Sequence, residues 1–169
     1  MCKMRRKAKK TTLILRKVFN MKKITSFTVD HTKLDKGIYV SRVDKDITTY
    51  DLRMRTPNTD DLMSHSAMHS FEHMLATFLR NSELADDILY CGPMGCQTGF
   101  YVLVRNAENE RVLNVLCSCL KGIIEYDGEI FGNSEVECGN YHTLDLGEAK
   151  KEAEKYLEVL KQPQTFMYK

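Results

Sequence analysis

The sequence predicts an α+β fold in a single domain, with an antiparallel β-sheet packed against about three or four α-helices. Segments rich in β-branched and aromatic residues come first in the chain, and stretches with apolar residues at helical spacing come later. These segments do not alternate as strand and helix, which is the order typical of a parallel sheet. At 169 residues the chain has the size of one domain.

Strands are expected at residues 24–29, 38–43 and 47–55, where Ile, Val, Thr, Tyr and Phe recur with partial alternation. The run Asp44-Lys45-Asp46 suits the turn between the second and third strands. A further strand is expected at 98–105, and its nearly continuous apolar run indicates a central position in the sheet.

Helices are expected at residues 66–81, 108–125 and 148–161, because apolar residues in each repeat at intervals of three and four. Such a repeat places the apolar side chains on one face, which can pack on the sheet. Residues 126–147 contain Gly and Asn and are expected to form a loop, while residues 82–92 give no clear pattern.

The net charge of +2 conceals an uneven distribution. Residues 1–20 contain eight Lys or Arg and no acidic residue, and residues 21–169 contain 17 basic and 23 acidic residues, a net charge of −6. An acidic body argues against nucleic acid as a partner. The basic leader can be a targeting segment, a nucleic acid-binding arm, or the product of a start codon upstream of Met21. We expect residues 1–20 to be an unpacked extension and residues 21–169 to be the domain.

The six cysteines come without a secretion signal, and a chain of this length does not need disulfides to fold. We therefore expect free thiols and a cytoplasmic protein. No apolar run approaches the roughly 20 residues of a membrane-spanning helix, so no membrane association is expected.

The run His69-Ser70-Phe71-Glu72-His73 forms the pattern His-x-x-Glu-His within the first predicted helix. Four residues make about one helical turn, so both histidines project from one face and could bind one metal ion. Glu72 lies beside that face, where a carboxylate could transfer protons. The alternative is an amphipathic helix with polar residues on its exposed side.

A catalytic metal site usually takes three protein ligands, so a third ligand must come from elsewhere in the chain. Cys138 is a candidate because it lies in a polar loop beside Gly139. His142 competes with it, and Glu135 and Glu137 are weaker candidates. From the residues alone, Cys138 could equally be an incidental loop cysteine.

Cys96 follows Gly95 and precedes Gln97-Thr98-Gly99, just before a predicted strand. Flanking glycines permit unusual backbone angles and expose a short side chain, so Cys96 is a candidate acid/base or nucleophilic thiol. Arg53, in a half-apolar strand, could face the site or the solvent, and His31 is equally ambiguous. Cys91, Cys117 and Cys119 are expected to be structural.

Three functions fit these residues. One is a metallopeptidase of the inverted His-x-x-Glu-His type, with Glu72 as the base. Another is a lyase or isomerase in which a metal acts as Lewis acid while Glu72 and Cys96 transfer protons. A structural metal-binding module is the third, and it leaves the Cys96 loop without a role.

Five motifs together resemble the S-ribosylhomocysteine lyase family, in the order and at the spacing found there. They extend from about Met21 to the C-terminus: Ser26-Phe27-Thr28-Val29-Asp30-His31, Asp51-Leu52-Arg53, His69-Ser70-Phe71-Glu72-His73, Pro93-Met94-Gly95-Cys96-Gln97-Thr98-Gly99-Phe100-Tyr101 and Cys138-Gly139. Residues 1–20 have no counterpart, which favours Met21 as the natural start.

The resemblance implies cleavage of S-ribosylhomocysteine into homocysteine and 4,5-dihydroxy-2,3-pentanedione, the autoinducer-2 precursor of quorum sensing, within the activated methyl cycle. It implies one divalent metal per subunit, natively Fe²⁺ with Zn²⁺ or Co²⁺ as substitutes, and a homodimer with active sites at the interface. The matching positions assign roles to nine residues: metal ligands His69, His73 and Cys138, catalytic residues Glu72 and Cys96, and substrate-binding residues Ser26, His31, Arg53 and Arg80.

Overall fold

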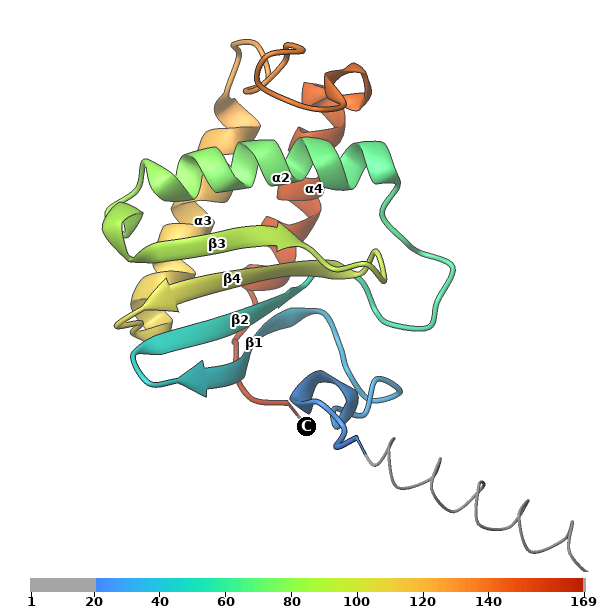
Figure 1. Cartoon of the computed structure of the whole chain (residues 1–169), viewed down its shortest axis with the longest axis vertical. Coiled ribbons are helices and arrows are strands. Elements are labelled where there is room, and N and C mark those ends of the chain that lie inside the picture. The colour runs from blue at the N-terminus through green and yellow to red at the C-terminus, as the bar shows by residue number, and fades with distance from the viewer. Residues whose placement is uncertain (1–20, 169) are drawn as a thin grey trace, which may run out of the picture.

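The computed structural model describes residues 21–168, and within them four antiparallel strands form one sheet in the order β1-β2-β4-β3 (Figure 1). Because the sheet is antiparallel and its strands are joined by tight turns or followed by helices, the predicted α+β class is confirmed. The strands are β1 (Gly37–Asp44), β2 (Ile47–Arg53), β3 (Ile88–Pro93) and β4 (Gly99–Arg105).

Three α-helices of the described chain pack against this sheet. Helices α3 (Asn109–Glu125) and α4 (Leu146–Leu160) pass behind it, and α2 (His65–Arg80) crosses them beside β3 (Figure 1). Side chains cap two of these helices, since Ser64 accepts a hydrogen bond from the Ala67 amide and Asp145 accepts one from the Glu148 amide. The start of α2 is therefore set by local sequence. The predicted helix at 66–81 is confirmed within one residue.

The core lies between the sheet and the helices. Alternate residues of the strands point into it, among them Tyr50 and Leu52 of β2, which have no exposed surface. The helices contribute the faces that their spacing predicts, and the six residues expected to be buried in α3 are all buried: Val112, Val115, Leu116, Cys119, Leu120 and Ile123.

On the other face of the sheet, no α-helix of the described residues is packed (Figure 1). Tyr39, Asp51 and Tyr101 are cross-strand partners on this face, because Asp51 alternates with the core residues of β2. The C-terminal segment covers part of the face: Tyr168 stacks on Tyr39 with ring centroids 5.0 Å apart and donates a hydrogen bond to Asp51 at 2.9 Å.

Two sequence assignments need correction. The strand expected at 24–29 is wrong, because this segment forms a short 3₁₀ helix, η1 (Thr25–Phe27), that does not pair with the sheet. Ile24 and Phe27 are 57% and 70% exposed, so the apolar residues that suggested a strand are not buried in this chain. Residues 82–92, which gave no clear pattern, contain η2 (Ala85–Asp87) and most of the edge strand β3.

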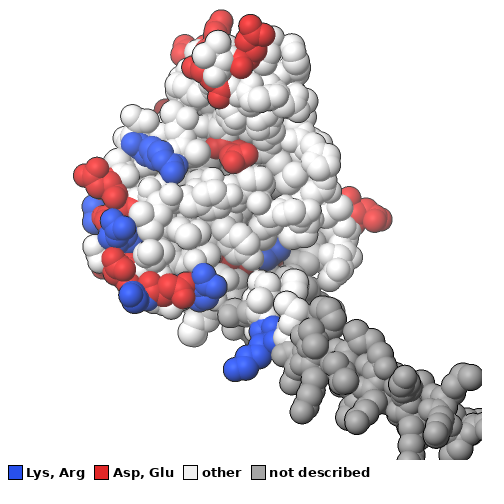
Figure 2. All heavy atoms as spheres, viewed as in Figure 1, with Lys and Arg blue, Asp and Glu red and all other residues white. Residues whose placement is uncertain are grey.

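Acidic side chains gather at the end of the molecule formed by the 126–147 loop, and basic ones on the face in view are interspersed with acids (Figure 2). The exposed acids of this loop include Asp127, Glu129, Glu135 and Glu137. This distribution agrees with the acidic body computed from the sequence. The predicted extension at residues 1–20 lies outside the described residues. Among the described helices, none is both long and apolar enough to cross a bilayer.

Candidate active site

Helix α2 presents His69 and His73 on one face, one turn apart. Their rings meet edge to face with centroids 4.7 Å apart, and both side chains are half-buried. Phe71, Met74 and Leu75 of the same helix are fully buried. The burial of this apolar stripe sets the rotation of α2 and thereby the direction in which the histidines point.

The hydrogen bond of His73 fixes its tautomer. Nδ1 of His73 lies 2.7 Å from the Phe131 carbonyl oxygen. A carbonyl can only accept, so Nδ1 carries the proton and Nε2 keeps a free lone pair. Gly132, the next residue, has φ +75°, and a Cβ there would lie 2.6 Å from His73 Nδ1. Only glycine lets the chain pass this close to the ring.

His69 has the same tautomer through a different partner. Its Nδ1 lies 2.9 Å from Thr143 Oγ1, and that hydroxyl donates to the Asn140 carbonyl at 3.2 Å. The single hydroxyl proton is thus engaged, so His69 Nδ1 is the donor and its Nε2 is free. Burial, and then the charge of His73, lower the pKa of His69, which favours the neutral ring that a metal requires.

Cys138 completes a group of three donors. Its Sγ lies 3.3 Å from His69 Nε2, and the donor atoms of His69, His73 and Cys138 all lie within 4.8 Å of one another. The Asn140 amide donates a hydrogen bond to the Cys138 sulfur at 3.4 Å. Among the described residues this is the group that could hold a metal ion, and the competing candidates His142, Glu135 and Glu137 are not in it.

The donor set fits a divalent metal. Two neutral imidazoles and one thiolate are ligands that zinc, iron and cobalt accept, and three protein ligands leave a position for water or substrate. Each imidazole also donates its second nitrogen to an oxygen, which is the usual arrangement around a metal-bound histidine.

Two serines of α2 fix the loop that carries Cys138. Ser66 Oγ donates to the Thr143 carbonyl at 2.7 Å, and Ser70 Oγ accepts from the Asp145 amide at 2.8 Å. The sequence did not single out these serines, nor Thr143, Phe131 and Gly132. Of these residues, only Gly132 could have been found from the sequence, because an isolated glycine in a loop indicates a special backbone conformation.

Glu72 lies on the flank of the same helix, half-buried beside His73. Burial raises its pKa, and the neighbouring His73 partly offsets this effect. A raised pKa brings a carboxylate closer to the pH at which it can both take up and release a proton.

The Cys96 loop docks on the start of the same helix. The Met63 amide donates to the Gln97 carbonyl at 3.1 Å, and the Gln97 side-chain nitrogen lies 3.3 Å from His65 Nε2. His65 precedes His69 by one turn, so the loop that carries the exposed Cys96 contacts the helix of the two histidines. Gln97 has φ +63°, a strained angle of the kind found at functional turns.

Arg53 lies at the end of β2, buried with 2% of its surface exposed. Burial lowers the pKa of this guanidinium, and Asp51, which pairs with it at 2.5 Å, raises it, so that the net shift is upward. Its Nη1 lies 4.0 Å from Cys96 Sγ. The positive charge of this guanidinium thus faces the Cys96 thiol, which is the first of the two orientations that the sequence left open for Arg53.

The remaining predicted substrate residues lie apart from the three donors. Ser26 and His31 belong to the segment around η1, and Ser26 lines a small pocket with Thr49 of β2 and Tyr101 of β4. Helix α2 lies beside β3 at the other edge of the sheet (Figure 1). The ring of His31 contacts the Val29 carbonyl at 3.0 Å. Arg80 ends α2, two turns after His73, and donates to the Leu89 carbonyl at 3.4 Å. Their substrate-binding role stays a prediction.

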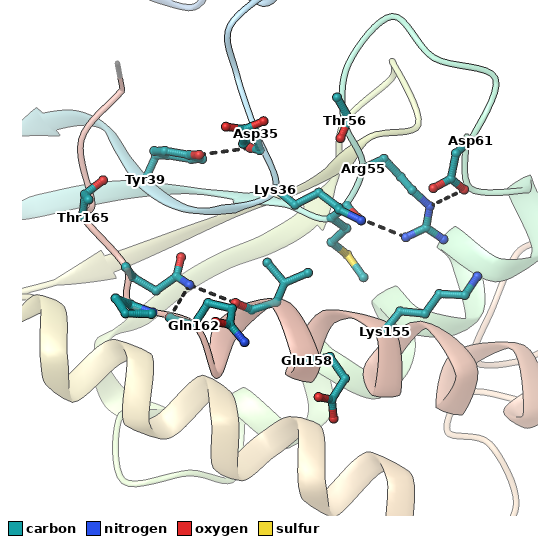
Figure 3. Close-up of a pocket in the computed structure, with 14 residues that line it drawn as sticks. Asp35, Lys36, Tyr39, Arg55, Thr56, Asp61, Lys155, Glu158, Gln162 and Thr165 are labelled. Carbon is teal, nitrogen blue, oxygen red and sulfur yellow. Dashed lines mark hydrogen bonds and ion pairs between the residues drawn. The ribbon is translucent and has the colours of Figure 1, made fainter.

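A roomy pocket of about 850 Å³ lies away from these residues, between the segment before β1 and the C-terminal end of α4 (Figure 3). Its charged groups compensate one another, since Arg55 pairs with Asp61 at 3.1 Å and, beyond the lining, with Glu152. The lining contains no histidine or cysteine, so this pocket offers neither an imidazole nor a thiolate as a metal ligand.

Comparison with known proteins identifies the family. The sequence model of the family S-Ribosylhomocysteinase (LuxS) matches residues 24–166. S-ribosylhomocysteine lyase from Desulfotalea psychrophila is 48% identical over 83% of this chain and 92% of its own length. The Borreliella afzelii lyase is 46% identical over 83% and 93%, and the Finegoldia magna lyase is 44% identical over 83% and 92%. The chain therefore belongs to the S-ribosylhomocysteinase (LuxS) family.

Proposed function

We propose that the site at α2 cleaves S-ribosylhomocysteine into homocysteine and dihydroxypentanedione, the reaction expected from the sequence motifs. The chain is a carbon–sulfur lyase by its family and its relatives. The observation that carries the proposal is the group formed by His69, His73 and Cys138. Glu72 lies on the helix of the two histidines, and the loop that carries Cys96 contacts the start of that helix. Nothing in the relatives favours the metallopeptidase alternative.

We assign the metal ligands to His69, His73 and Cys138, because each has a donor atom free for coordination. When bound, a divalent metal polarises a carbonyl oxygen of the substrate and stabilises the negative charge that develops on it. The donor set suits Fe²⁺, Zn²⁺ and Co²⁺ alike, so Fe²⁺ as the native ion follows from the family resemblance. Metal analysis of protein purified without oxygen tests that choice.

Glu72 and Cys96 are the proton carriers of this proposal. The carbonyl of the open-chain sugar must migrate from C1 to C3, and each shift removes a proton beside a carbonyl and returns one to the former carbonyl carbon. Removal of a proton from C4 then expels the homocysteine sulfur from C5. Glu72 is attached to the helix that carries the histidines, and Cys96 approaches from the adjoining loop, so the two groups reach different carbons.

A homodimer explains the placement of Ser26 and His31. The segment that contains η1 lies away from α2 within one chain (Figure 1), and no α-helix of the described residues packs on one face of the sheet. A second copy packed on that face would bring its own η1 segment toward the α2 site. Ser26, His31 and Arg80 then contact the substrate, together with Arg53.

Mixed dimers test this arrangement. Protein with His31→Ala and protein with Cys96→Ala should each be inactive, whereas co-refolded mixtures should regain up to about a quarter of wild-type activity, since in half of the dimers one site is intact. If each site uses residues of one chain only, the mixture will stay inactive.

Purified protein incubated with S-ribosylhomocysteine, with released thiol titrated, tests the reaction itself. Thiol release that depends on Glu72 and Cys96 supports the proposal. Peptide cleavage without thiol release would overturn it in favour of the metallopeptidase. We also place the enzyme in the cytoplasm, in keeping with the free cysteines of the described chain.

A further inference from the structure

A second side chain of the Cys96 loop points at the same sulfur. Thr98 Oγ1 lies 3.1 Å from Cys96 Sγ and 2.5 Å from Arg53 Nη1. Thr98 is 3% exposed, whereas Cys96 is exposed. Because Arg53 Nη1 is 4.0 Å from Sγ, the threonine hydroxyl is the nearer of the two polar groups.

The hydrogen bonds of Thr98 fix the direction of its proton. A guanidinium has donors only, so Thr98 Oγ1 accepts from Arg53 Nη1. The one hydroxyl proton of Thr98 is then available to Cys96 Sγ. A thiolate can only accept, so this contact is satisfied best when Cys96 is ionised.

The surrounding structure holds the hydroxyl in this orientation. The amides of Met54 and Arg55 both donate to the Thr98 carbonyl at 3.0 Å. Asp51 grips Arg53 through two hydrogen bonds, at 3.1 and 2.5 Å, and Tyr168 donates to Asp51 at 2.9 Å. Asp51, Arg53 and Thr98 are at most 3% exposed, so water hardly competes for these bonds.

We propose that Thr98 is a positioning residue that donates a hydrogen bond to the Cys96 thiolate and keeps Cys96 ionised for proton abstraction. This inference deepens the proposed function and rests on the role of Cys96 there. Other charged or titratable groups also face the loop: Arg53 from β2, Tyr101 from β4 and His65 from α2. A substitution at Thr98 leaves the contacts of Tyr101 and His65 in place, whereas Thr98→Val also removes the acceptor of Arg53 Nη1.

The test compares three variants of the full, metal-loaded chain. Thr98→Val removes the hydroxyl and conserves the shape, Thr98→Ser keeps the hydroxyl, and Thr48→Val removes a buried hydroxyl at the opposite end of β2. The rate of Cys96 alkylation by iodoacetamide is measured across pH, from the mass of the peptide that contains Cys96. Thiol release from S-ribosylhomocysteine and thermal melting are measured on the same samples.

Thr98→Val should slow alkylation at neutral pH about ten-fold, the effect of one hydrogen bond to a charged acceptor. It should move the midpoint of the pH profile upward and leave the plateau rate at high pH unchanged. Thr98→Ser and Thr48→Val should follow the wild type. If Thr98→Val does not fold, Thr98→Ala removes the same hydroxyl and leaves space.

An unchanged midpoint, whatever the melting temperature, would overturn the proposal, since a purely structural role lowers stability without moving the profile. An equal shift in Thr98→Ser or Thr48→Val would also overturn it, because the hydroxyl would then not be the cause. The rate of Cys96 alkylation can be measured without catalytic turnover, so it tests the role of Thr98 independently of the reaction. A wild-type protein that releases no thiol therefore refutes the proposed reaction and leaves this inference to be decided by the pH profile.

Discussion

Gly132→Ala should weaken metal binding although Gly132 offers no ligand atom. The added Cβ would lie 2.6 Å from His73 Nδ1 and 2.7 Å from Cε1 of the same ring. To reach an ordinary contact of 3.4 Å the ring must retreat by about 0.8 Å. The retreat also stretches the hydrogen bond from Nδ1 to the Phe131 carbonyl, which holds the ring in its tautomer.

The size of the effect follows from two costs. Ligands of a functional site must be held within about 0.5 Å of their working positions, which a shift of this size exceeds. Loss of the outer hydrogen bond of a metal-bound histidine typically costs about 10- to 100-fold in metal affinity. The positive φ of Gly132 adds about 1–2 kcal/mol of backbone strain for alanine, and this lowers the melting temperature of the metal-free protein by several degrees.

Competition with a chelator, followed by metal analysis, measures the affinity. Gly139→Ala is the matched control: it lies in the same loop beside Cys138, and its added Cβ meets nothing within 4 Å. We expect Gly139→Ala to retain metal like the wild type and Gly132→Ala to lose it at about 10- to 100-fold lower chelator concentration. Equal retention by both variants would refute the argument that the backbone at Gly132 positions His73.

Three further predictions concern the proposed ligands, the proton carriers and the extension. Cys138→Ala should lose both metal and activity, because two histidines without a thiolate do not complete the site; full metal occupancy would exclude Cys138 as a ligand and direct the test to His142. Cys96→Ala and Glu72→Gln should keep metal and fold but release thiol about 10²- to 10⁴-fold more slowly, the usual worth of one acid/base group; near-normal release would remove the residue from the mechanism. Deletion of residues 1–20 should leave activity, metal content, dimerisation and melting temperature unchanged; a drop of several degrees would show that the segment packs on the domain.

The helices were predicted well because each carries a continuous apolar face. Burial of that face decides the structure, and it can be read from spacing alone, as in α3. The segment at 24–29 has suitable residues for a strand but pairs with no strand among residues 21–168, so local preference misled the assignment. β3 was missed for the opposite reason: it is a short edge strand, and pairing with β4 decides its conformation.

The side chains that could hold the metal were predictable, but their supports were not. The spacing of His69 and His73 predicts that both bind one metal ion. The choice of Cys138 as the third ligand needed either the family resemblance or the fold. Thr143 contacts His69 through its side-chain hydroxyl, and Phe131 contacts His73 through its backbone carbonyl, a group that every residue has. Such contacts depend on where the 20-residue segment 126–145, between α3 and α4, returns to α2, and no local pattern encodes that path.

The geometry also indicates why the His-x-x-Glu-His spacing serves a lyase here. A metallopeptidase needs one carboxylate to activate a water molecule, and Glu72 alone would supply it. A reaction that moves a carbonyl along a sugar needs two proton carriers at different carbons. The Cys96 loop meets α2 one turn before His69, and Glu72 lies just before His73, so both proposed carriers are tied to the helix that holds the histidine pair. In the proposed mechanism the positive φ at Gln97 and the buried Arg53 near Cys96 Sγ would both help to present an ionised Cys96, whereas a peptidase mechanism assigns them no role. It is therefore the placement of this thiol, more than the histidine spacing, that separates the two chemistries.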